Sequence, residues 1–448
     1  MKLMLSKIAE MTDGIMFGTD REVDYIVTDN REIKENNTMF AVIKGANVDA
    51  HTFVADVLKN DTCSALIEDM RYVKAGCVMV DDVTKALARI SEKLRTEIMD
   101  DVICVAITGS VGKTTTKEMI AAALGEYKIY KTRGNRNSQV SAPITVTEVP
   151  EDADILISEL GMSLVGEMER LSKAVRPNYC IITNIGTSHI GQLGSKENIL
   201  REKMMIAKYM KSGGRIIMNG DDPLLWAQKE KDPSIIYYGI NNKECDVTAE
   251  NIVVGRNTTK FIVNVDGKTF DVKIKTLGTH NVLNSLAAFA VGSVMSLDLE
   301  KIAKGLETFE NEGNRLKIYE KNGINVICDC YNASPESMKA SLEVLGNCDG
   351  RKIAVLGDML ELGESSDTYH REVGKAAKEK HIDELITFGE YSRFLCEGFG
   401  GGYSFDMNER EMFIEKIKQV LKTNDTVLFK ASNGLKFINV VEKLDLKK

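Results

Sequence analysis

The stretch Val105-Ala-Ile-Thr-Gly-Ser-Val-Gly-Lys-Thr-Thr115 decides how the middle of this chain folds. It runs from an apolar, strand-like segment through a turn with two glycines into a helix-like segment. Backbone N–H groups at such a junction hold phosphate oxygens, the lysine neutralises the β- and γ-phosphates, and the hydroxyl after it can ligate Mg²⁺. The spacing is G-x-x-G-K-T, because Ile107 stands where the usual pattern has its first glycine. The sequence therefore predicts a nucleotide-binding loop made of Gly109, Ser110, Val111, Gly112, Lys113, Thr114 and Thr115.

The order strand, turn, helix repeats around this loop, which is typical of a parallel sheet with crossover helices. The apolar runs lie at 102–107, 154–158 and 179–185. Further along, the runs 261–265 and 270–274 flank the turn Asp266-Gly267, a pattern that predicts an antiparallel hairpin. We therefore expect a central P-loop domain, 101–312, that combines a parallel sheet with an antiparallel patch.

The segment before the central domain has the pattern of a small α/β domain, 1–100. Short β-like runs alternate with turns and with a helical stretch at 52–59. These runs lie at 25–27, 39–43, 65–67 and 78–80. A closing helix carries apolar residues at helical spacing, which places them on one face. They are Leu87, Ile90, Leu94 and Ile98.

After the central domain, strands and helices alternate again over 313–448. The strands are expected at 324–328, 353–356, 385–388 and 426–429. Such a series predicts a doubly wound domain whose ligands bind beyond the carboxyl ends of the strands. The fold class is therefore α/β, with three domains in the chain.

Composition and charge limit the classes of function. The 448-residue chain has 58 Lys+Arg and 66 Asp+Glu and a formal charge of −8, and it shows no long basic cluster that would favour nucleic-acid binding. Nine cysteines are scattered without CxxC pairs, as expected of reduced thiols in the cytoplasm. No signal-peptide pattern is visible, and the longest apolar stretch, around 286–297, is too short for a membrane span. We expect a cytoplasmic monomer.

Two polar residues follow the predicted strands beside the phosphate loop. Glu159 comes after the strand at 154–158, and His189 lies in the loop after the strand at 179–185. Each residue alone reads as an ordinary polar loop residue. Because the carboxyl ends of parallel strands meet at one edge of a sheet, however, both are expected near the phosphates. Mg²⁺ prefers oxygen ligands and needs few protein carboxylates, so Glu159 is a candidate ligand.

Lys203 has two interpretations. In a helix expected at 196–210 it shares one stripe with Ile199, Ile206 and Met210, so its stem faces inward. It can be a lysine that buries its stem and keeps its charge in water. It can also be a desolvated lysine whose neutral amine reacts with carbon dioxide to form a carbamate that bridges metal ions.

Together with motifs along nearly the whole chain, these residues resemble the Mur ligase family, ATP-dependent enzymes that form amide bonds in bacterial cell-wall synthesis. The most discriminating motifs are Asp329-Cys-Tyr-Asn-Ala-Ser-Pro335 and Val355-Leu-Gly-Asp-Met-Leu-Glu-Leu-Gly363. The other matching motifs are Asp29-Asn-Arg31, Lys44-Gly45, Asp49-Ala-His51, Gly134-Asn-Arg-Asn137, Glu159-Leu-Gly161, Asn219-Gly-Asp-Asp-Pro223, His280-Asn-Val-Leu-Asn284 and Asn314-Arg315. The chain departs from the family pattern at Asn30, Ser138, Ser141 and 430–433.

The resemblance implies a ligase that joins D-alanyl-D-alanine to UDP-N-acetylmuramoyl-tripeptide through an acyl phosphate. It implies that the first domain binds the UDP sugar, that the central domain binds ATP, and that the third domain closes on ATP and binds the amino substrate. It also implies catalytic roles for Lys113, Glu159, His189 and Lys203. Two Mg²⁺ ions would be held by Thr114, Glu159, His189 and a carbamylated Lys203.

The resemblance also assigns binding residues. Asn281, Arg315 and Asp329 match positions that contact adenine, phosphate and ribose respectively. The implied substrate residues are Asn30, Arg31, Lys44, Gly45, His51, Asn135, Asn137, Asn332 and Ser334. Whether the third residue of the acceptor peptide is lysine or diaminopimelate stays open.

Other functions remain as alternatives. A sister ligase that adds another amino acid, or a folylpolyglutamate-type amide ligase, would use the same ATP site. A non-catalytic paralogue would bind the nucleotide without turnover. A generic P-loop kinase is less favoured, because it leaves the motif at 329–335 without a role.

Overall fold

The computed structural model describes residues 2–33, 36–45 and 48–447. It divides into two compact units. The first contains the described residues of Met1–Thr108, Gly125–Ile181 and Glu202–Ile216, and the second contains those of Gly109–Leu124, Ile182–Arg201 and Ile217–Lys448. Each unit is built from sheets flanked by helices, which confirms the α/β fold class.

The first unit begins with a five-stranded sheet in the order β2-β7-β6-β5-β4. Its strands are β2 (Ile15–Phe17), β4 (Tyr25–Val27), β5 (Thr38–Ala41), β6 (Ser64–Ile67) and β7 (Cys77–Met79). All neighbouring strands are parallel except β2 and β7. The helices of this part are α1 (Leu5–Thr12), α2 (Val54–Val57) and α3 (Val83–Lys93).

The closing helix differs from the expectation at its end. Leu87, Ile90 and Leu94 are fully buried as predicted, but Ile98 is 56% exposed, so its assignment to the same face was wrong. After α3 the chain continues as a π-helical turn over Leu94–Ile98, in which the N–H of Met99 donates to the carbonyl of Leu94. A wider turn changes the rotation per residue, which carries Ile98 off the buried face.

The first unit also holds the parallel strands next to the phosphate loop, β8 (Ile103–Thr108), β9 (Ile129–Lys131), β10 (Ile155–Glu159) and β11 (Tyr179–Ile182). Their order is β11-β8-β10-β9, and β8 and β9 both pair in parallel with β10. Helices α5 (Ser141–Thr147) and α6 (Glu167–Val175) accompany them. Nearly every residue of β8 and β10 is buried, as expected of strands covered on both faces.

Two predicted boundaries in this region were wrong. β11 ends at Ile182 instead of 185, because the side chains of Thr183 and Asn184 leave the strand to bind the phosphate loop. The helix expected at 196–210 is α8 (Lys196–Met204), followed by a 3₁₀ turn. There the Ser172 hydroxyl donates to the carbonyl of Ile206 and accepts from the N–H of Tyr209, which takes these groups out of a regular helix.

Strands β12 (Arg215–Asn219), β13 (Ile236–Gly239) and β14 (Val247–Val254) are parallel neighbours. The strands β15 (Thr259–Val265) and β16 (Lys268–Ile274) add an antiparallel hairpin. Both turn residues have positive φ, 53° at Asp266 and 72° at Gly267, as a type I′ turn requires. The predicted hairpin is therefore confirmed. Helices α4 (Lys113–Ala123), α10 (Thr279–Val294) and α11 (Leu299–Leu306) pack against one another.

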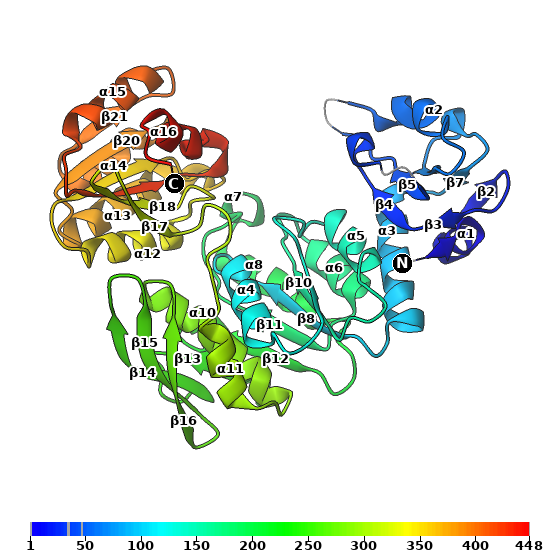
Figure 1. Ribbon diagram of the computed structural model, residues 1–448, viewed down its shortest axis with the longest axis horizontal. Coiled ribbons are helices and arrows are strands. Elements are labelled where there is room, and N and C mark those ends of the chain that lie inside the picture. The colour runs from blue at the N-terminus through cyan, green and yellow to red at the C-terminus, as the bar shows by residue number, and fades with distance from the viewer. Residues whose placement is uncertain (1, 34–35, 46–47, 448) are drawn as a thin grey trace. The chain divides into compact units, whose positions relative to one another are not determined.

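The C-terminal sheet, drawn from yellow to red in Figure 1, has the order β17-β18-β22-β19-β20-β21. Its strands are β17 (Lys317–Lys321), β18 (Ile324–Cys328), β19 (Lys352–Gly357), β20 (Glu384–Phe388), β21 (Tyr403–Phe405) and β22 (Thr426–Lys430), and only β17 is antiparallel. The helices are α12 (Pro335–Gly346), α13 (Ser366–Glu379), α14 (Ser392–Phe399), α15 (Arg410–Val420) and α16 (Phe437–Lys443). Two separate apolar clusters form its core, one with α12 to α14 and one with α15 and α16. In the described part of the chain no helix combines the length and apolar character needed to cross a membrane.

Candidate active site

The phosphate loop connects β8 to α4. Gly109 and Gly112 have φ values of 152° and 84°, which side chains with a Cβ rarely adopt. At Gly112 a Cβ would also lie 2.8 Å from Oδ1 of Asn284. Helix α4 begins at Lys113, and no side chain of the described residues caps it. The start of a helix that is not capped by a side chain is a common place for an anion to bind.

The loop after β11 holds this phosphate loop in place. The side-chain amide of Asn184 donates to the carbonyl of Val111 and accepts from its N–H, both at 3.0 Å. The N–H of Ser110 donates to the carbonyl of Asn184 at 3.1 Å, and the hydroxyl of Thr183 donates to the carbonyl of Val111 at 2.6 Å. The N–H groups of Ser110 and Val111, which the sequence assigned to phosphate, are thus bonded to Asn184.

Two of the predicted nucleotide residues meet at the start of α4. The guanidinium of Arg315 donates to the hydroxyl of Thr114 at 3.0 Å and stacks on the ring of Tyr331 at 3.6 Å. The ammonium of Lys113 donates to the carbonyls of Gly109 and Ser110 at 2.7 and 3.3 Å. Two cationic side chains are therefore gathered at the loop, which suits it to a polyphosphate.

Asn281 reaches the phosphate loop only through a second asparagine. It is 3% exposed, and its amide nitrogen donates to Thr276 and to the carbonyl of Leu277. Its oxygen accepts from Asn284, whose own oxygen accepts from the hydroxyl of Thr116 in α4. In this structure the amide nitrogen and the amide oxygen of Asn281 are therefore both bonded to protein groups, and Asn284 connects Asn281 to α4.

His189 lies in the loop between β11 and α8. Its Nδ1 is 2.8 Å from a carboxylate oxygen of Glu361, in the loop after β19. Two residues earlier, the N–H and the hydroxyl of Thr187 donate to the carboxylate of Glu336, at the start of α12. Sequence analysis did not identify Glu336 as a partner of Thr187 or Glu361 as a neighbour of His189. Nothing in the spacing of the two glutamates relates them to residues 186–189.

The first unit positions Glu159 and Lys203. Glu159 ends β10, is 2% exposed, and accepts a hydrogen bond from the amide of Asn137 at 2.8 Å. Its N–H donates to the hydroxyl of Thr132. Lys203 lies in α8 and is 2% exposed. Asn137 and Glu159 are thus brought together as a pair, while the exposed Asn135 contacts Asn137 through its backbone carbonyl.

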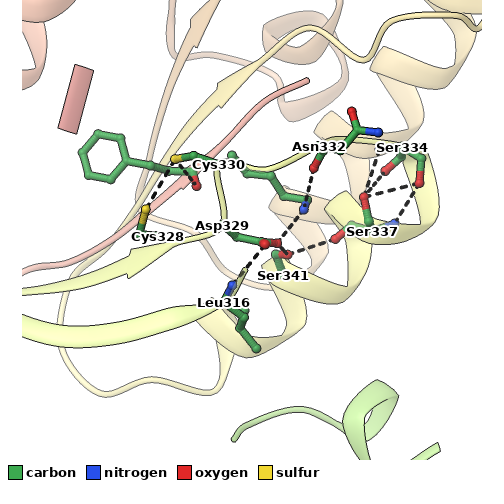
Figure 2. A network of polar contacts seen from close by, with 10 residues as sticks. Leu316, Cys328, Asp329, Cys330, Asn332, Ser334, Ser337 and Ser341 are labelled. Atoms are coloured by element: carbon green, nitrogen blue, oxygen red, sulfur yellow. Dashed lines mark hydrogen bonds and ion pairs between the residues drawn. The ribbon is translucent and has the colours of Figure 1, made fainter. Parts of the chain in front are cut away.

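Asp329 is the centre of a buried polar network (Figure 2). Its carboxylate accepts from the N–H of Leu316 at 3.1 Å, the hydroxyl of Ser341 at 2.7 Å and the ammonium of Lys430 at 2.5 Å. Burial acts to raise the pKa of Asp329, but the charge of Lys430 and these hydrogen bonds outweigh it, so the pKa lies below its usual value. Asp329 is therefore held as an anion. Lys430, which sequence reasoning did not assign, is its main partner.

The two predicted dipeptide residues lie beside this network. The ammonium of Lys430 also donates to the backbone carbonyl of Asn332 at 3.1 Å. Figure 2 shows the side chain of Asn332 directed away from Asp329. Ser334 caps α12 by accepting from the N–H of Ser337. The backbone here is thus fixed by Lys430 and the cap, which leaves the Asn332 amide on the outside of the network.

The predicted sugar-site residues fall into two groups. Lys44, Gly45 and His51 gather around Asp49, which pairs with Lys44 through a β-bridge and with the imidazole of His51 at 2.7 Å. His51 is 3% exposed and stacks on Tyr72. Hydrogen bonding by His51 lowers the pKa of Asp49.

The second group is the turn that contains Asn30 and Arg31. Arg31 donates to Asp29 from two nitrogens, and this hydrogen bonding lowers the pKa of Asp29 to about 2. The Arg31 side chain is 85% exposed. Among the described residues no hydrogen bond or ion pair joins this turn to the one around Asp49.

The predicted donor set suits Mg²⁺ by its chemistry. Thr114 and Glu159 offer a hydroxyl and a carboxylate, which are hard oxygen ligands, and His189 adds an imidazole. Thr114 and His189 belong to the second unit, and Glu159 and Lys203 belong to the first. Among the described residues no group of three or more His, Cys, Asp or Glu side chains is placed to hold a metal ion.

Comparison with known proteins adds independent information. Two family models match: the Mur ligase middle domain over residues 107–292, and the Mur ligase, glutamate ligase domain over residues 314–433. The chain is 35% identical over 459 residues to the UDP-N-acetylmuramoyl-tripeptide--D-alanyl-D-alanine ligase of Bacillus subtilis (strain 168), covering 99% of this chain and 98% of that one. Its identity to the ligase of the same name from Escherichia coli (strain K12) is 29% over 446 residues, with 98% of each covered.

Solved structures give the same picture. Crystal structure I of MurF from Acinetobacter baumannii superposes with a TM-score of 0.92 at 30% identity, covering 100% of this chain and 99% of that one. The MurF ligase of Thermotoga maritima in complex with ADP gives a TM-score of 0.83 at 26% identity, covering 94% and 97%.

Proposed function

This chain belongs to the Mur ligase family, and on that premise we propose that it joins D-alanyl-D-alanine to UDP-N-acetylmuramoyl-tripeptide in the cytoplasm, at the expense of ATP. The observation that carries this proposal is the meeting of Arg315, Thr114 and Lys113 at one phosphate loop. The full-length match to D-alanyl-D-alanine ligases supplies the substrates.

The reaction follows from the chemistry of carboxylates. An amine does not attack a carboxylate at a useful rate, because the leaving group is poor and the negative charge repels the nucleophile. Transfer of the γ-phosphoryl group of ATP to the substrate carboxylate forms an acyl phosphate and ADP. The amine of D-alanyl-D-alanine then attacks the acyl carbon, loses a proton, and expels phosphate. Negative charge develops in both steps, and preorganised cations are the means to stabilise it.

Different residues of this chain would bind the phosphates and the metal ions. The N–H groups at the start of α4 and the ammonium of Lys113 would bind the phosphates, and Arg315 would move from the Thr114 hydroxyl to the γ-phosphate. Thr114, Glu159, His189 and Lys203, the last as a carbamate, would hold two Mg²⁺ ions that supply charge stabilisation when bound. Lys203 is 2% exposed, and this burial is what supports its assignment to the interior of the site.

The remaining assignments concern the substrates and the domains. Asp329, kept anionic by Lys430, would bind the ribose, and Asn332 and Ser334 would contact the dipeptide. The groups around Asp49 and Asn30 would bind the UDP sugar. We propose the division into domains at 1–100, 101–312 and 313–448, with these three tasks assigned in that order, and a monomeric enzyme.

The test is phosphate release from ATP with UDP-N-acetylmuramoyl-tripeptides that end in lysine or in diaminopimelate, each with and without D-alanyl-D-alanine. We expect release only when ATP, one tripeptide and the dipeptide are all present. Release that depends instead on another amino acid or on glutamate and folate would identify a sister ligase or a folylpolyglutamate-type ligase. Tight ATP binding without release under any combination would identify a non-catalytic paralogue.

A further inference from the structure

Lys430 holds two points of the turn that leads from β18 to α12. Its ammonium donates to the Asp329 carboxylate at 2.5 Å and to the backbone carbonyl of Asn332 at 3.1 Å (Figure 2). Asp329 directly follows β18, and Asn332 lies three residues before Pro335, where α12 begins. A single side chain therefore ties the start of this turn to its middle.

The strand that carries Lys430 fixes its position. β22 lies between β18 and β19 in the C-terminal sheet, and Lys430 is its last residue, paired with Leu356 of β19. The carbonyl of Phe429, one residue earlier, accepts from the N–H of Asp329 at 3.0 Å. The Lys430 side chain is 3% exposed. Because its backbone is held in the sheet and its side chain is buried, the ammonium is a fixed point for the turn.

A second side chain reaches Asp329 by a different route. The hydroxyl of Ser341, in α12, donates to the same carboxylate oxygen at 2.7 Å. Its other contact is with the carbonyl of Ser337 in its own helix, at 3.0 Å. Lys430 and Ser341 thus share Asp329, but of the two it is Lys430 that also bonds to Asn332.

The stability of the fold gives no strong reason for this buried ion pair. The side chains of Lys430 and Asp329 are 3% and 14% exposed. Taking an ammonium and a carboxylate out of water is costly, and well-packed apolar side chains in place of such a pair are often as stable or more stable. An apolar side chain, however, could neither hold Asp329 as an anion nor donate to the Asn332 carbonyl. The pair is therefore better explained by what it positions.

We propose that Lys430 is a positioning residue that links the nucleotide site to the dipeptide site. This inference rests on the proposed function, which places the ribose at Asp329 and the dipeptide at Asn332. Ribose hydroxyls that donate to Asp329 fix its carboxylate and, through the ammonium of Lys430, order the backbone at Asn332. Such a coupling is reciprocal, so a bound dipeptide also favours a bound nucleotide.

The first measurement needs no amino substrate. Hydrogen exchange read by mass spectrometry follows the backbone of residues 330–334 with and without saturating ADP. In the wild type we expect ADP to slow exchange in this segment. Lys430→Met has a side chain of similar length without the charge, and we expect it to lose this effect of ADP even at full saturation. Its ADP affinity, measured by calorimetry, should fall about 10- to 100-fold, because a hydrogen bond from a charged donor is lost.

Ser341→Ala is the matched control. It removes one hydrogen bond from Asp329 and keeps the contact between Lys430 and Asn332. We expect ADP to bind about 2- to 10-fold more weakly and, at saturation, still to slow exchange at 330–334. In the phosphate-release assay, Lys430→Met should raise the KM for D-alanyl-D-alanine about 10-fold, and Ser341→Ala should leave this KM unchanged.

A pair of variants without a buried carboxylate covers the case in which Lys430→Met does not fold, since it leaves Asp329 without its cation. Asp329→Asn is then compared with the double substitution of Asp329→Asn and Lys430→Met. Neither charge remains in the double variant, which also lacks the hydrogen bond to Asn332. At saturating ATP its KM for the dipeptide should be about 10-fold higher than that of Asp329→Asn. Equal KM values would contradict the link.

Two further results would overturn the proposal. One is that ADP fails to slow exchange at 330–334 in the wild type, or still slows it in Lys430→Met. The other is an equal rise of the dipeptide KM in Ser341→Ala, which would show a general loosening of the network. A loss of stability alone lowers the apparent kcat but changes neither readout. Failure of the proposed function, seen as no dipeptide-dependent phosphate release by the wild type, is a separate outcome, because exchange is read with ADP alone.

Discussion

Lys113 shows how a single residue is prepared for phosphate. Its ammonium lies against the carbonyls of Gly109 and Ser110, within reach of an anion placed at the start of α4. We expect Lys113→Ala to lower kcat about 10²- to 10³-fold, because one preorganised charge-stabilising group is typically worth that much. Steady-state phosphate release measures it. Lys128→Ala, which removes an exposed ion pair with Asp152, is the control, and equal turnover in both variants would remove Lys113 from the mechanism.

Lys203 gives a second test at this scale, because its two interpretations make different predictions. If a carbamate is required, Lys203→Ala loses activity and regains part of it when short carboxylic acids are added. Lys203→Arg keeps the positive charge but cannot form the carbamate, so we expect it to stay inactive. Full activity of either variant in the phosphate-release assay would favour the lysine that only buries its stem.

Asp358 affects stability through its charge. Its side chain is 4% exposed, and burial raises its pKa from 3.8 to about 6, although the N–H of Tyr391 donates to it. The folded state thus binds the proton more tightly than the unfolded state. The resulting stabilisation is fully present below pH 3.8 and is lost as the pH rises through about 6.

An uncharged isostere should remove this pH dependence. The difference in the free energy of unfolding between Asp358→Asn and the wild type should shift in favour of the variant by up to about 3 kcal/mol from pH 4 to pH 8. The reason is that one pKa unit equals about 1.4 kcal/mol. Hydrogen exchange in β19, corrected for intrinsic exchange rates, measures the free energy of unfolding of both proteins at each pH. The pKa of His370, whose Nε2 lies 3.8 Å from a carboxylate oxygen of Asp358, is lowered by burial and acts with the opposite sign. A constant difference across this range would contradict the raised pKa.

Among the elements, the phosphate loop depends most on a neighbour that is distant in sequence. Asn184 pairs with both backbone groups of Val111, much as a neighbouring strand would. We expect Asn184→Ala to weaken ADP binding about 10- to 100-fold, because two hydrogen bonds of about 1 kcal/mol each are lost and the loop gains freedom. Isothermal titration calorimetry measures the affinity.

The control for this prediction uses the same residue type just before β11. Asn178 accepts from the N–H of Cys104 at 2.8 Å, away from the phosphate loop. Asn178→Ala should lower stability and leave ADP affinity unchanged. If Asn184→Ala also bound ADP as the wild type does, the loop would be rigid without its neighbour.

On the scale of the whole molecule, the proposed mechanism requires the C-terminal domain to close on the nucleotide. Arg315 and Asp329 come from that part of the chain, and their proposed ligands are the γ-phosphate and the ribose. We expect small-angle scattering to show a smaller radius of gyration when a non-hydrolysable ATP analogue and the UDP substrate are added together. In Arg315→Ala the decrease should be reduced. No compaction in the wild type would argue against closure.

The fold class and most of the elements could be predicted from the order of residues alone. Local periodicity marked the strands and the β15–β16 hairpin, because side-chain alternation and turn residues are properties of short segments. It also marked Lys113 and Thr114, since a phosphate loop is continuous in the chain. The ends of β11 and α8 were misjudged, because they are set by Asn184 and Ser172, whose partners are distant in sequence.

Which side chains meet could be learned only from the folded chain. Three pairs show this: Lys430 with Asp329, Glu361 with His189, and Asn184 with Val111. The two residues of each pair are at least 73 positions apart in the sequence. No spacing rule links such residues, because the contacts arise where separate strands and loops end at a common edge of a sheet. The sequence therefore specified the groups that carry the chemistry, and folding determined how each of them is charged, oriented and held.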